Sequence, residues 1–366
     1  MKPATTSARV PIWKQIAFGA IVMIPLIVIA EIVVRANLDP PGYVPLNHLE
    51  DPLYVPDPVR GYTLKPGAHS DYVTPDLDVD IDISADGLRD APLADARRAH
   101  YRVLAVGDSF TMGLAVRQED TWAEQLERLM NAAEPARASA VVNGGVPGYS
   151  PTQIRERLEE LLPKVEPNVV VFGFVTETFV RMVRPLQLFG GTLVRSDAVP
   201  NMRATKTGIL YSPFATSWIR EIDFFLNRHW QFMAHVVSRI YRATHPAVAD
   251  DWQRIGLDPG VVREHMQSSL EELARASDLS RRAGAEFVVL LINLQDRGKS
   301  FGPRQFVYNR VVADYCAEQS LVCVDVLPEL DQVAAGRSVF RTPSDQHWTP
   351  AAHAIAAQAL LRVLRR

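Results

Sequence analysis

The sequence predicts a three-layer α/β/α fold, in which helices cover both faces of a parallel sheet, together with an insertion and one amino-terminal membrane helix. Short apolar runs recur from residue 101 onward, and segments with helical spacing separate them. Strands that are apolar throughout are typical of sheets buried on both faces. A nineteen-residue apolar stretch, Ile16–Val34, predicts the terminal helix.

The composition excludes several classes of protein. Of the 366 residues, 47% are hydrophobic and 22% are charged, which is typical of a globular chain and not of a disordered or collagenous one. A net charge of -3 gives no electrostatic basis for binding nucleic acid. The two cysteines, Cys316 and Cys323, exclude a disulfide scaffold and a zinc site with the usual spacing. They could pair with each other or remain buried thiols.

The apolar stretch predicts a membrane anchor. Its only charged residue is Glu31, and at about 1.5 Å per residue it nearly spans a hydrocarbon core of about 30 Å. The flanking cations are concentrated before it, at Lys2, Arg9 and Lys14. The positive-inside rule then predicts a cytoplasmic tail at residues 1–14, a transmembrane helix at 15–35 in the inner (cytoplasmic) membrane, and a periplasmic, extracytoplasmic remainder.

Two other interpretations of this stretch remain. A cleaved signal peptide is disfavoured because the apolar run is long and Val28-Ile29-Ala30 is a poor cleavage site. A buried core helix is disfavoured by the terminal position and the flanking charges.

Residues 36–98 are expected to form an extended arm or linker with one strand. Residues 38–75 are rich in proline and glycine, which predicts irregular chain. Residues 76–82 alternate apolar and acidic side chains, which predicts a strand with one buried face. A calcium-binding loop is the alternative, but it would need glycine where Ile81 stands.

Residues 99–366 are expected to form the catalytic domain, with an insertion at 184–260 that packs over the sheet edge or the site. Within the insertion, Ile219–Tyr241 has the spacing of one amphipathic helix. The predicted strands are Arg102–Val106, Ala138–Val142, Val169–Val175, Phe287–Ile292 and Leu321–Val326. The predicted helices are Trp122–Ala133, Thr152–Leu162, Val262–Ala283, Gln305–Glu318 and Pro350–Leu364.

Polar residues with catalytic potential follow two of the strands and precede the last helix. Gly107-Asp108-Ser109-Phe110 comes directly after the first strand, where Ser109 could act as a nucleophile or simply belong to a helix cap. Asp345 and His347 lie two residues apart on a loop, so the carboxylate could hold the imidazole in one tautomer. Asn143 to Tyr149 contains three glycines, whose amides could approach a ligand closely or merely form a turn.

Taken together, these segments resemble the SGNH (GDSL) hydrolase family, whose fold is flavodoxin-like. Gly107-Asp108-Ser109-Phe110 is similar to the family's first block, Asn143–Gly148 to its second, and Asp345 with His347 to its last. Asp86-Gly87-Leu88-Arg89-Asp90 resembles the segment before the first block in membrane-anchored bacterial members. The resemblance implies a catalytic set of Ser109, Asp345 and His347. It also implies an oxyanion hole with the N–H groups of Ser109 and Gly148.

Two departures from the family pattern bear on activity. Gly173 to Thr178 replaces a third block that usually supplies an asparagine donor to the oxyanion. Glu177 falls near that position and cannot donate when ionised, whereas Thr176 or Thr178 could. The last block reads Asp-x-His-Trp, which resembles relatives that transfer acetyl groups on bacterial polysaccharides. Further candidates for lining the site are Asp108, Asn143 and Glu177, because they lie in the first block, the second block and the segment that replaces the third.

The expected function is that of a membrane-anchored serine esterase without metal or cofactor, acting on ester groups, above all O-acetyl groups, of an extracytoplasmic glycan or a small substrate. An O-acyltransferase to a polysaccharide is the first alternative. A non-catalytic binding or assembly protein, with Glu177 marking a decayed oxyanion hole, is the second. His353 is expected to pack in the core, and Asp325 to cap a helix near Pro328.

Overall fold

The computed structural model describes residues 11–45, 53–74, 77–183, 185–190, 192–205, 208–245, 257–294, 301–336, 338–341 and 345–365. The chain divides into two compact units, which we describe separately. One contains residues 1–46 and 198–248, and the other residues 47–197 and 249–366.

The larger unit is built on a five-stranded parallel sheet in the order β14-β13-β8-β6-β7. Each strand comes within one or two residues of its predicted bounds, because a continuous run of buried apolar residues marks a central strand clearly. The strands are β6 (Tyr101–Val106), β7 (Ser139–Asn143), β8 (Val169–Val175), β13 (Glu286–Ile292) and β14 (Val322–Asp325).

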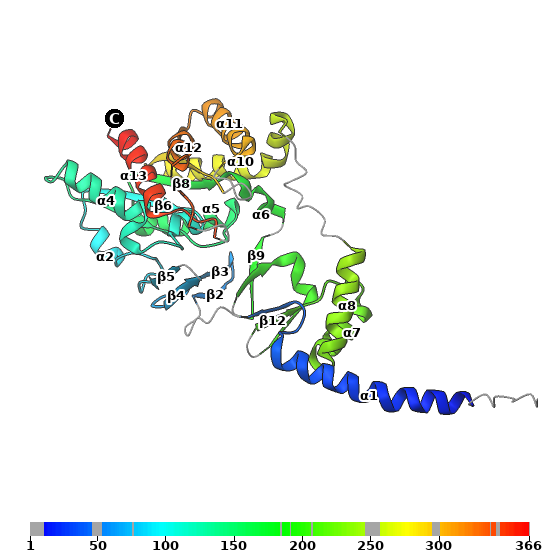
Figure 1. The fold of residues 1–366 in the computed structure, drawn as a ribbon. Coiled ribbons are helices and arrows are strands. Elements are labelled where there is room, and N and C mark those ends of the chain that lie inside the picture. Colours follow the sequence, from blue (N-terminus) through cyan, green and yellow to red (C-terminus); the bar gives the residue numbers. More distant parts are fainter. Residues whose placement is uncertain are drawn as a thin grey trace, which may run out of the picture. The chain divides into compact units, whose positions relative to one another are not determined.

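Helices cover both faces of this sheet, which confirms the three-layer α/β/α architecture (Figure 1). One face packs in one core cluster with α5 (Pro151–Val165), α10 (Pro259–Arg282) and α11 (Pro303–Glu318). The opposite face packs in a second cluster with α4 (Trp122–Ala133), α12 (Leu327–Ala334) and α13 (Pro350–Leu364). Alternate strand residues supply the two clusters: Leu104 and Val106 contribute to the first, Val103 and Ala105 to the second.

Short helices join these elements at their ends. They are α2 (Leu93–Ala96), α3 (Ser109–Met112), η1 (Gln118–Asp120), η2 (Thr176–Phe179) and α6 (Val180–Val183). The cap of α4 is Thr121, whose hydroxyl accepts a hydrogen bond from the Glu124 N–H at 3.3 Å.

The prediction of irregular chain over residues 38–75 is wrong. This region forms β1 (Tyr43–Pro45) and the hairpin strands β2 (Tyr54–Asp57), β3 (Gly61–Leu64) and β4 (His69–Thr74). β4 pairs with β5 (Leu77–Asp82), and the alternation predicted for β5 is confirmed by buried Val79 and Ile81 between exposed aspartates. Tyr62 and Leu64 are completely buried, so the arm belongs to the hydrophobic core of its unit.

The insertion predicted at 184–260 is divided between the two units. Its first hairpin, β9 (Leu186–Phe189) with β10 (Thr192–Arg195), belongs to the unit of the parallel sheet. Residues 198–248 belong to the unit of the amino-terminal helix. Its remaining elements are η3 (Ser196–Asn201), β11 (Met202–Ala204), β12 (Gly208–Tyr211), α7 (Ser217–His229) and α8 (Gln231–Thr244).

The smaller unit joins α1 (Ile12–Asn37) to α7, α8 and a three-stranded antiparallel sheet in the order β1-β12-β11. The single helix predicted for Ile219–Tyr241 is two helices, because the backbone leaves helical geometry at Trp230 (φ −141°, ψ 70°). α1 is long and apolar enough to be a membrane span or a signal sequence. Of the predicted cytoplasmic tail, residues 1–10 lie outside the described residues.

Candidate active site

Ser109 lies at the carboxyl end of β6, as the first residue of the short helix α3. Asp108 precedes it as the N-cap, and its carboxylate accepts a hydrogen bond from the Phe110 N–H at 3.0 Å. The Ser109 side chain is buried, with 6% of the residue exposed. Carboxyl ends of parallel strands are the usual position of sites in such sheets.

Two glycines allow α3 to pack tightly between neighbouring loops. A Cβ on Gly107 would lie 2.0 Å from Thr111 Oγ1, and a Cβ on Gly145 would lie 2.4 Å from the Met112 nitrogen. The Val146 N–H donates to the Gly107 carbonyl at 3.0 Å and joins the two loops directly. The residues of the first and second sequence blocks are therefore held side by side.

His347 connects Ser109 with Asp345 through its two ring nitrogens. Nε2 lies 2.8 Å from Ser109 Oγ, and Nδ1 lies 2.6 Å from Asp345 Oδ1. The same carboxylate oxygen accepts the His347 backbone N–H at 2.9 Å. The structure thus brings together the three side chains that the sequence proposed, although 236 residues separate Ser109 from Asp345.

Two aromatic residues hold the imidazole and its carboxylate. The Phe110 ring lies 5.0 Å from the His347 ring, centroid to centroid. The Tyr72 hydroxyl, from β4, donates to Asp345 Oδ2 at 3.1 Å. Both oxygens of the carboxylate therefore accept hydrogen bonds from groups that fix its orientation. Sequence reasoning missed Tyr72, because it lies in the segment predicted to be irregular.

The Asp345 carboxyl is held in its ionised form. Burial alone would raise its pKa, but the hydrogen bonds and charge of His347, with the Tyr72 hydroxyl, lower the pKa of Asp345 below its ordinary value. An ionised carboxylate beside Nδ1 keeps a proton on that nitrogen and leaves Nε2 as the acceptor facing Ser109.

Two backbone N–H groups, one in each of the first two sequence blocks, are available as donors. Within the described part of the chain, the amides of Ser109 and Gly148 have no hydrogen-bond acceptor. Gly148 adopts a φ of +79°, and a Cβ there would lie 2.8 Å from the Tyr62 hydroxyl. The local backbone therefore requires glycine at this position. Arg181 holds the loop against the first block, since its guanidinium contacts both Asp108 Oδ2 (2.9 Å) and the Tyr149 carbonyl (3.3 Å).

Glu177 is turned toward β13 and α11. Its carboxylate accepts hydrogen bonds from Thr176 Oγ1 (3.0 Å), the Leu294 N–H (3.3 Å) and Gln305 Nε2 (3.3 Å). In the sheet order β8 separates β13 from β6, so these contacts lie on the side of β8 opposite the Ser109 strand. Burial raises the pKa of Glu177 to about 7, although the same three donors act to lower it.

The remaining predicted residues have structural partners. The Thr176 hydroxyl is held by Glu177 and by the Asn293 amide at 2.9 Å, so its proton is directed at the glutamate. The side chain of Thr178 lies outside the described residues. Asn143 accepts the Gly145 N–H at 3.1 Å and shapes the loop of the second block.

Four further residues from the sequence analysis lie outside the Ser109 site. His353 is buried and accepts the Trp122 N–H at 3.1 Å, and burial lowers its pKa to about 3. Asp325 accepts the Leu327 N–H at 2.9 Å at the start of α12. Cys316 and Cys323 are free thiols. Among the described residues, no cluster of three or more His, Cys, Asp or Glu side chains could hold a metal ion.

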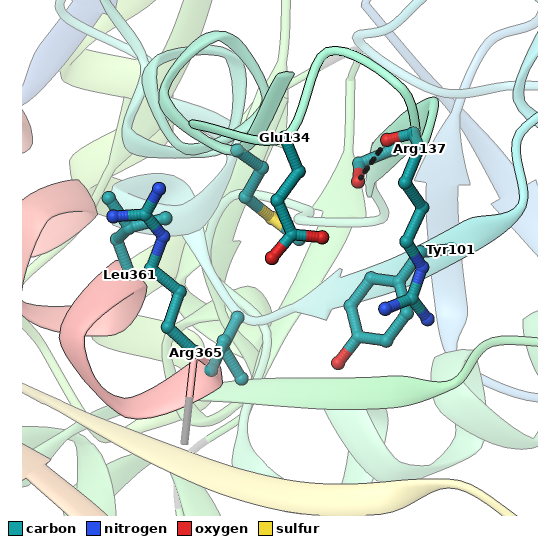
Figure 2. Close-up of a pocket in the computed structure, with 8 residues that line it drawn as sticks. Tyr101, Glu134, Arg137, Leu361 and Arg365 are labelled. Atoms are coloured by element: carbon teal, nitrogen blue, oxygen red, sulfur yellow. Dashed lines mark hydrogen bonds between the residues drawn. The ribbon is translucent and has the colours of Figure 1, made fainter. Parts of the chain in front are cut away.

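A hollow of about 240 Å³ lies at the other end of the sheet (Figure 2). Tyr101 and Ser139 begin β6 and β7, so this hollow is at the amino ends of the strands that carry the site at their carboxyl ends. Figure 2 shows the Arg137 guanidinium over the Tyr101 ring, 4.4 Å from its centroid. The hollow is therefore not part of the Ser109 site.

Comparison with known proteins yields fold neighbours only. No family model and no curated protein matches the chain. Solved structures that match include an alpha/beta hydrolase enzyme from the metagenome of Lake Arreo, Spain, at 16% identity and a TM-score of 0.42, over 72% of this chain and 94% of that one. A catalytic mutant of an acetylxylan esterase from Geobacillus stearothermophilus matches at 15% identity and a TM-score of 0.41, over 72% and 94%.

A member of the lipolytic protein G-D-S-L family from Veillonella parvula matches at 14% identity and a TM-score of 0.40, over 73% of this chain and 99% of that chain. Because these identities and TM-scores are low, the proposed function rests on the geometry of the site and on the sequence motifs.

Proposed function

We propose that the protein is a serine esterase of the SGNH type, anchored to the inner membrane by α1 with its catalytic unit outside the cytoplasm. The observation that supports the activity best is the continuous chain of contacts from Ser109 Oγ through His347 to Asp345, at 2.8 Å and 2.6 Å. An arrangement of nucleophile, base and orienting acid within hydrogen-bond reach is characteristic of covalent acyl transfer.

In the first half of the reaction, His347 Nε2 takes the proton of Ser109 Oγ as that oxygen attacks the ester carbonyl. Asp345 stabilises the imidazolium that forms and does not take its proton. Negative charge develops on the former carbonyl oxygen, where the N–H groups of Ser109 and Gly148 would donate to it. The imidazolium then protonates the leaving alcohol, and the acyl group remains on Ser109.

In the second half, an acceptor hydroxyl attacks the acyl-serine with His347 as base. Water as acceptor gives hydrolysis, and a sugar hydroxyl gives transfer. We favour O-acetyl groups of an extracytoplasmic glycan as the substrate, since the Asp-x-His-Trp block resembles that of enzymes acting on such groups. Transfer to a polysaccharide is the alternative, and the ratio of free acetate to acetylated glycan distinguishes the two.

The position of Glu177 supports an enzyme over a binding protein. A carboxylate directed at the oxyanion would oppose its negative charge, but the Glu177 carboxylate is bound by groups of β13 and α11. The amides of Ser109 and Gly148 therefore face no opposing charge from this residue.

The test is labelling of the full-length protein in detergent with a fluorophosphonate, which reacts only with an activated serine. We expect labelling of the natural chain and its loss in Ser109→Ala and His347→Ala. Ser268→Ala, an exposed serine on α10, is the matched control and should label normally. A folded natural chain that does not label would overturn the esterase and leave the binding protein as the remaining candidate.

A further inference from the structure

The helices α7 and α8 expose an apolar surface, which we call the α7–α8 stripe. On α7 it consists of Trp218, Ile222 and Phe225, with 65%, 49% and 56% of each residue exposed. Spacings of four and three residues place these side chains on one line along the helix. Three large apolar side chains in a row are unusual on a surface that faces water.

The buried side of α7 includes polar residues. Asp223 and Asn227, both 4% exposed, lie there beside Phe224 at 9%, while the stripe faces outward. The Asn227 amide donates to the Asp223 carbonyl at 2.9 Å, which helps to satisfy the buried polar groups. A helix that buries polar residues and exposes tryptophan and phenylalanine fits an apolar environment outside the protein better than water.

The stripe continues on α8. Met233 and Ile240 are 39% and 60% exposed, and the half-buried Val236 and Val237 lie between them at helical spacing. Trp230, 44% exposed, lies at the junction of the two helices. Exposed arginines on these helices accompany the stripe at positions 228, 239 and 242. Arginine beside an apolar surface with tryptophan is the composition of helices that lie at a lipid headgroup layer.

α8 is fixed directly to the carboxyl-terminal part of α1. The Glu31 carboxylate accepts the N–H groups of Gln231 at 2.9 Å and Phe232 at 2.8 Å, and so caps α8, which has no side-chain cap from its own N-cap residue. Arg35 contacts Glu31 at 2.5 Å and the Arg228 carbonyl at 3.2 Å. In Figure 1, α8 runs across α1 rather than along it.

These contacts fix the depth at which α8 begins. α1 has 26 residues and a length of about 39 Å, longer than a hydrocarbon core of about 30 Å. Glu31 lies six residues, or about 9 Å, before the end of α1, near the outer end of the predicted span, from where its carboxylate can reach the headgroup layer. A helix that starts at this level and crosses α1 extends along the membrane surface.

We propose that the α7–α8 stripe lies in the outer interface of the same membrane that α1 spans, with its apolar side chains at the boundary of headgroups and acyl chains. This inference goes beyond the proposed esterase activity and rests on the proposed anchoring by α1. Its occupant is a lipid surface, and anionic headgroups would neutralise the accompanying arginines.

The experiment measures the depth of single probes in the full chain, reconstituted in vesicles of phosphatidylethanolamine and phosphatidylglycerol. Cys316→Ser and Cys323→Ser remove the natural thiols. An environment-sensitive fluorophore is then attached through Ile222→Cys or Ile240→Cys. Glu221→Cys, an exposed charged position next to the stripe on α7, is the matched control, and Ile24→Cys within α1 reports insertion.

We expect blue-shifted emission and quenching by lipids with a shallow nitroxide at positions 222 and 240, and emission typical of water at position 221. Equal, unquenched emission at 221 and 222, in vesicles where the probe at position 24 is quenched, would overturn the proposal. So would protection of position 222 without lipid quenching, because a second copy or another protein would then cover the stripe. Fluorophosphonate labelling of the same samples reports the catalytic proposal separately.

Discussion

Tyr72 provides a sharp test of the catalytic geometry, because its hydroxyl donates to the orienting carboxylate, whereas its ring packs edge-on against His347. Tyr72→Phe removes the hydrogen bond to Asp345 Oδ2 at 3.1 Å and keeps the ring. A hydrogen bond to a charged group contributes about 1.5–3 kcal/mol when buried, and the half-buried position of Tyr72 favours the lower end. If most of this loss falls on the transition state, kcat decreases by about tenfold, since 1.36 kcal/mol is one decade.

The assay is hydrolysis of a chromogenic acetate ester between pH 5 and 9. The hydroxyl of Tyr72 lowers the pKa of Asp345, so its removal leaves a carboxylate that binds the protonated imidazole more tightly. We therefore expect the acid limb of kcat/KM to move to higher pH, an effect that a merely structural role would not produce. Tyr54→Phe, on the neighbouring hairpin, is the matched control. An unchanged kcat together with an unmoved acid limb for Tyr72→Phe would refute the positioning role.

Two predictions concern stability, measured by urea unfolding. Folding raises the pKa of Glu177 from its ordinary value of 4.5 to about 7. Its protonated form therefore adds up to about 3 kcal/mol to the free energy of unfolding below pH 4.5, and this contribution is lost as the pH rises to 7. Glu177→Gln should remove this slope, whereas Glu264→Gln, an exposed control, should retain it. Arg89 is buried, and its guanidinium donates to the Gly113 and Val116 carbonyls. Arg89→Met should therefore lower the free energy of unfolding by about 2–4 kcal/mol, whereas Arg98→Met, at an exposed position, should change it little. Equal losses in the two variants would contradict this prediction.

The parallel sheet could be predicted from the sequence because each strand is buried on both faces. Val169–Val175 contains no polar side chain, so both its bounds and its central position follow from the run itself. The hairpins of the arm carry no such signal. Tyr54–Asp57 is a strand of four residues that contains proline. Proline is tolerated in a strand at a sheet edge, where its missing N–H is not needed for pairing, so its presence wrongly indicated irregular chain here.

The boundary between α7 and α8 at Trp230 could not be predicted from the sequence for a different reason. The exposed apolar positions of α8, Met233 and Ile240, continue in phase with Trp218 and Ile222 of α7 at a period of 3.6 residues. One continuous helix would have presented the same stripe, so periodicity could not mark the boundary. The stripe itself was visible in the sequence, but its orientation was not, because apolar residues at helical spacing are usually buried.

In the candidate site too, residues within local motifs could be predicted, whereas residues that act through partners far along the chain could not. Ser109, Asp345 and His347 could be proposed because each belongs to a local motif next to a strand or helix boundary. Tyr72 and Arg181 stand alone in the sequence and act only through partners far along the chain, at Asp345 and Asp108. The direction of Glu177 likewise depends on Leu294 and Gln305, more than 100 residues away.

These distant contacts explain how the segment after β8, which contains no asparagine, is ordered. The strand end after β8 is held by Glu177 and Thr176 against β13 and α11, which uses the polar groups of that segment for structure. Independently of this segment, the Tyr72 hydroxyl from the hairpin arm orients the Asp345 carboxylate. The arm would therefore be required for activity as well as for the core.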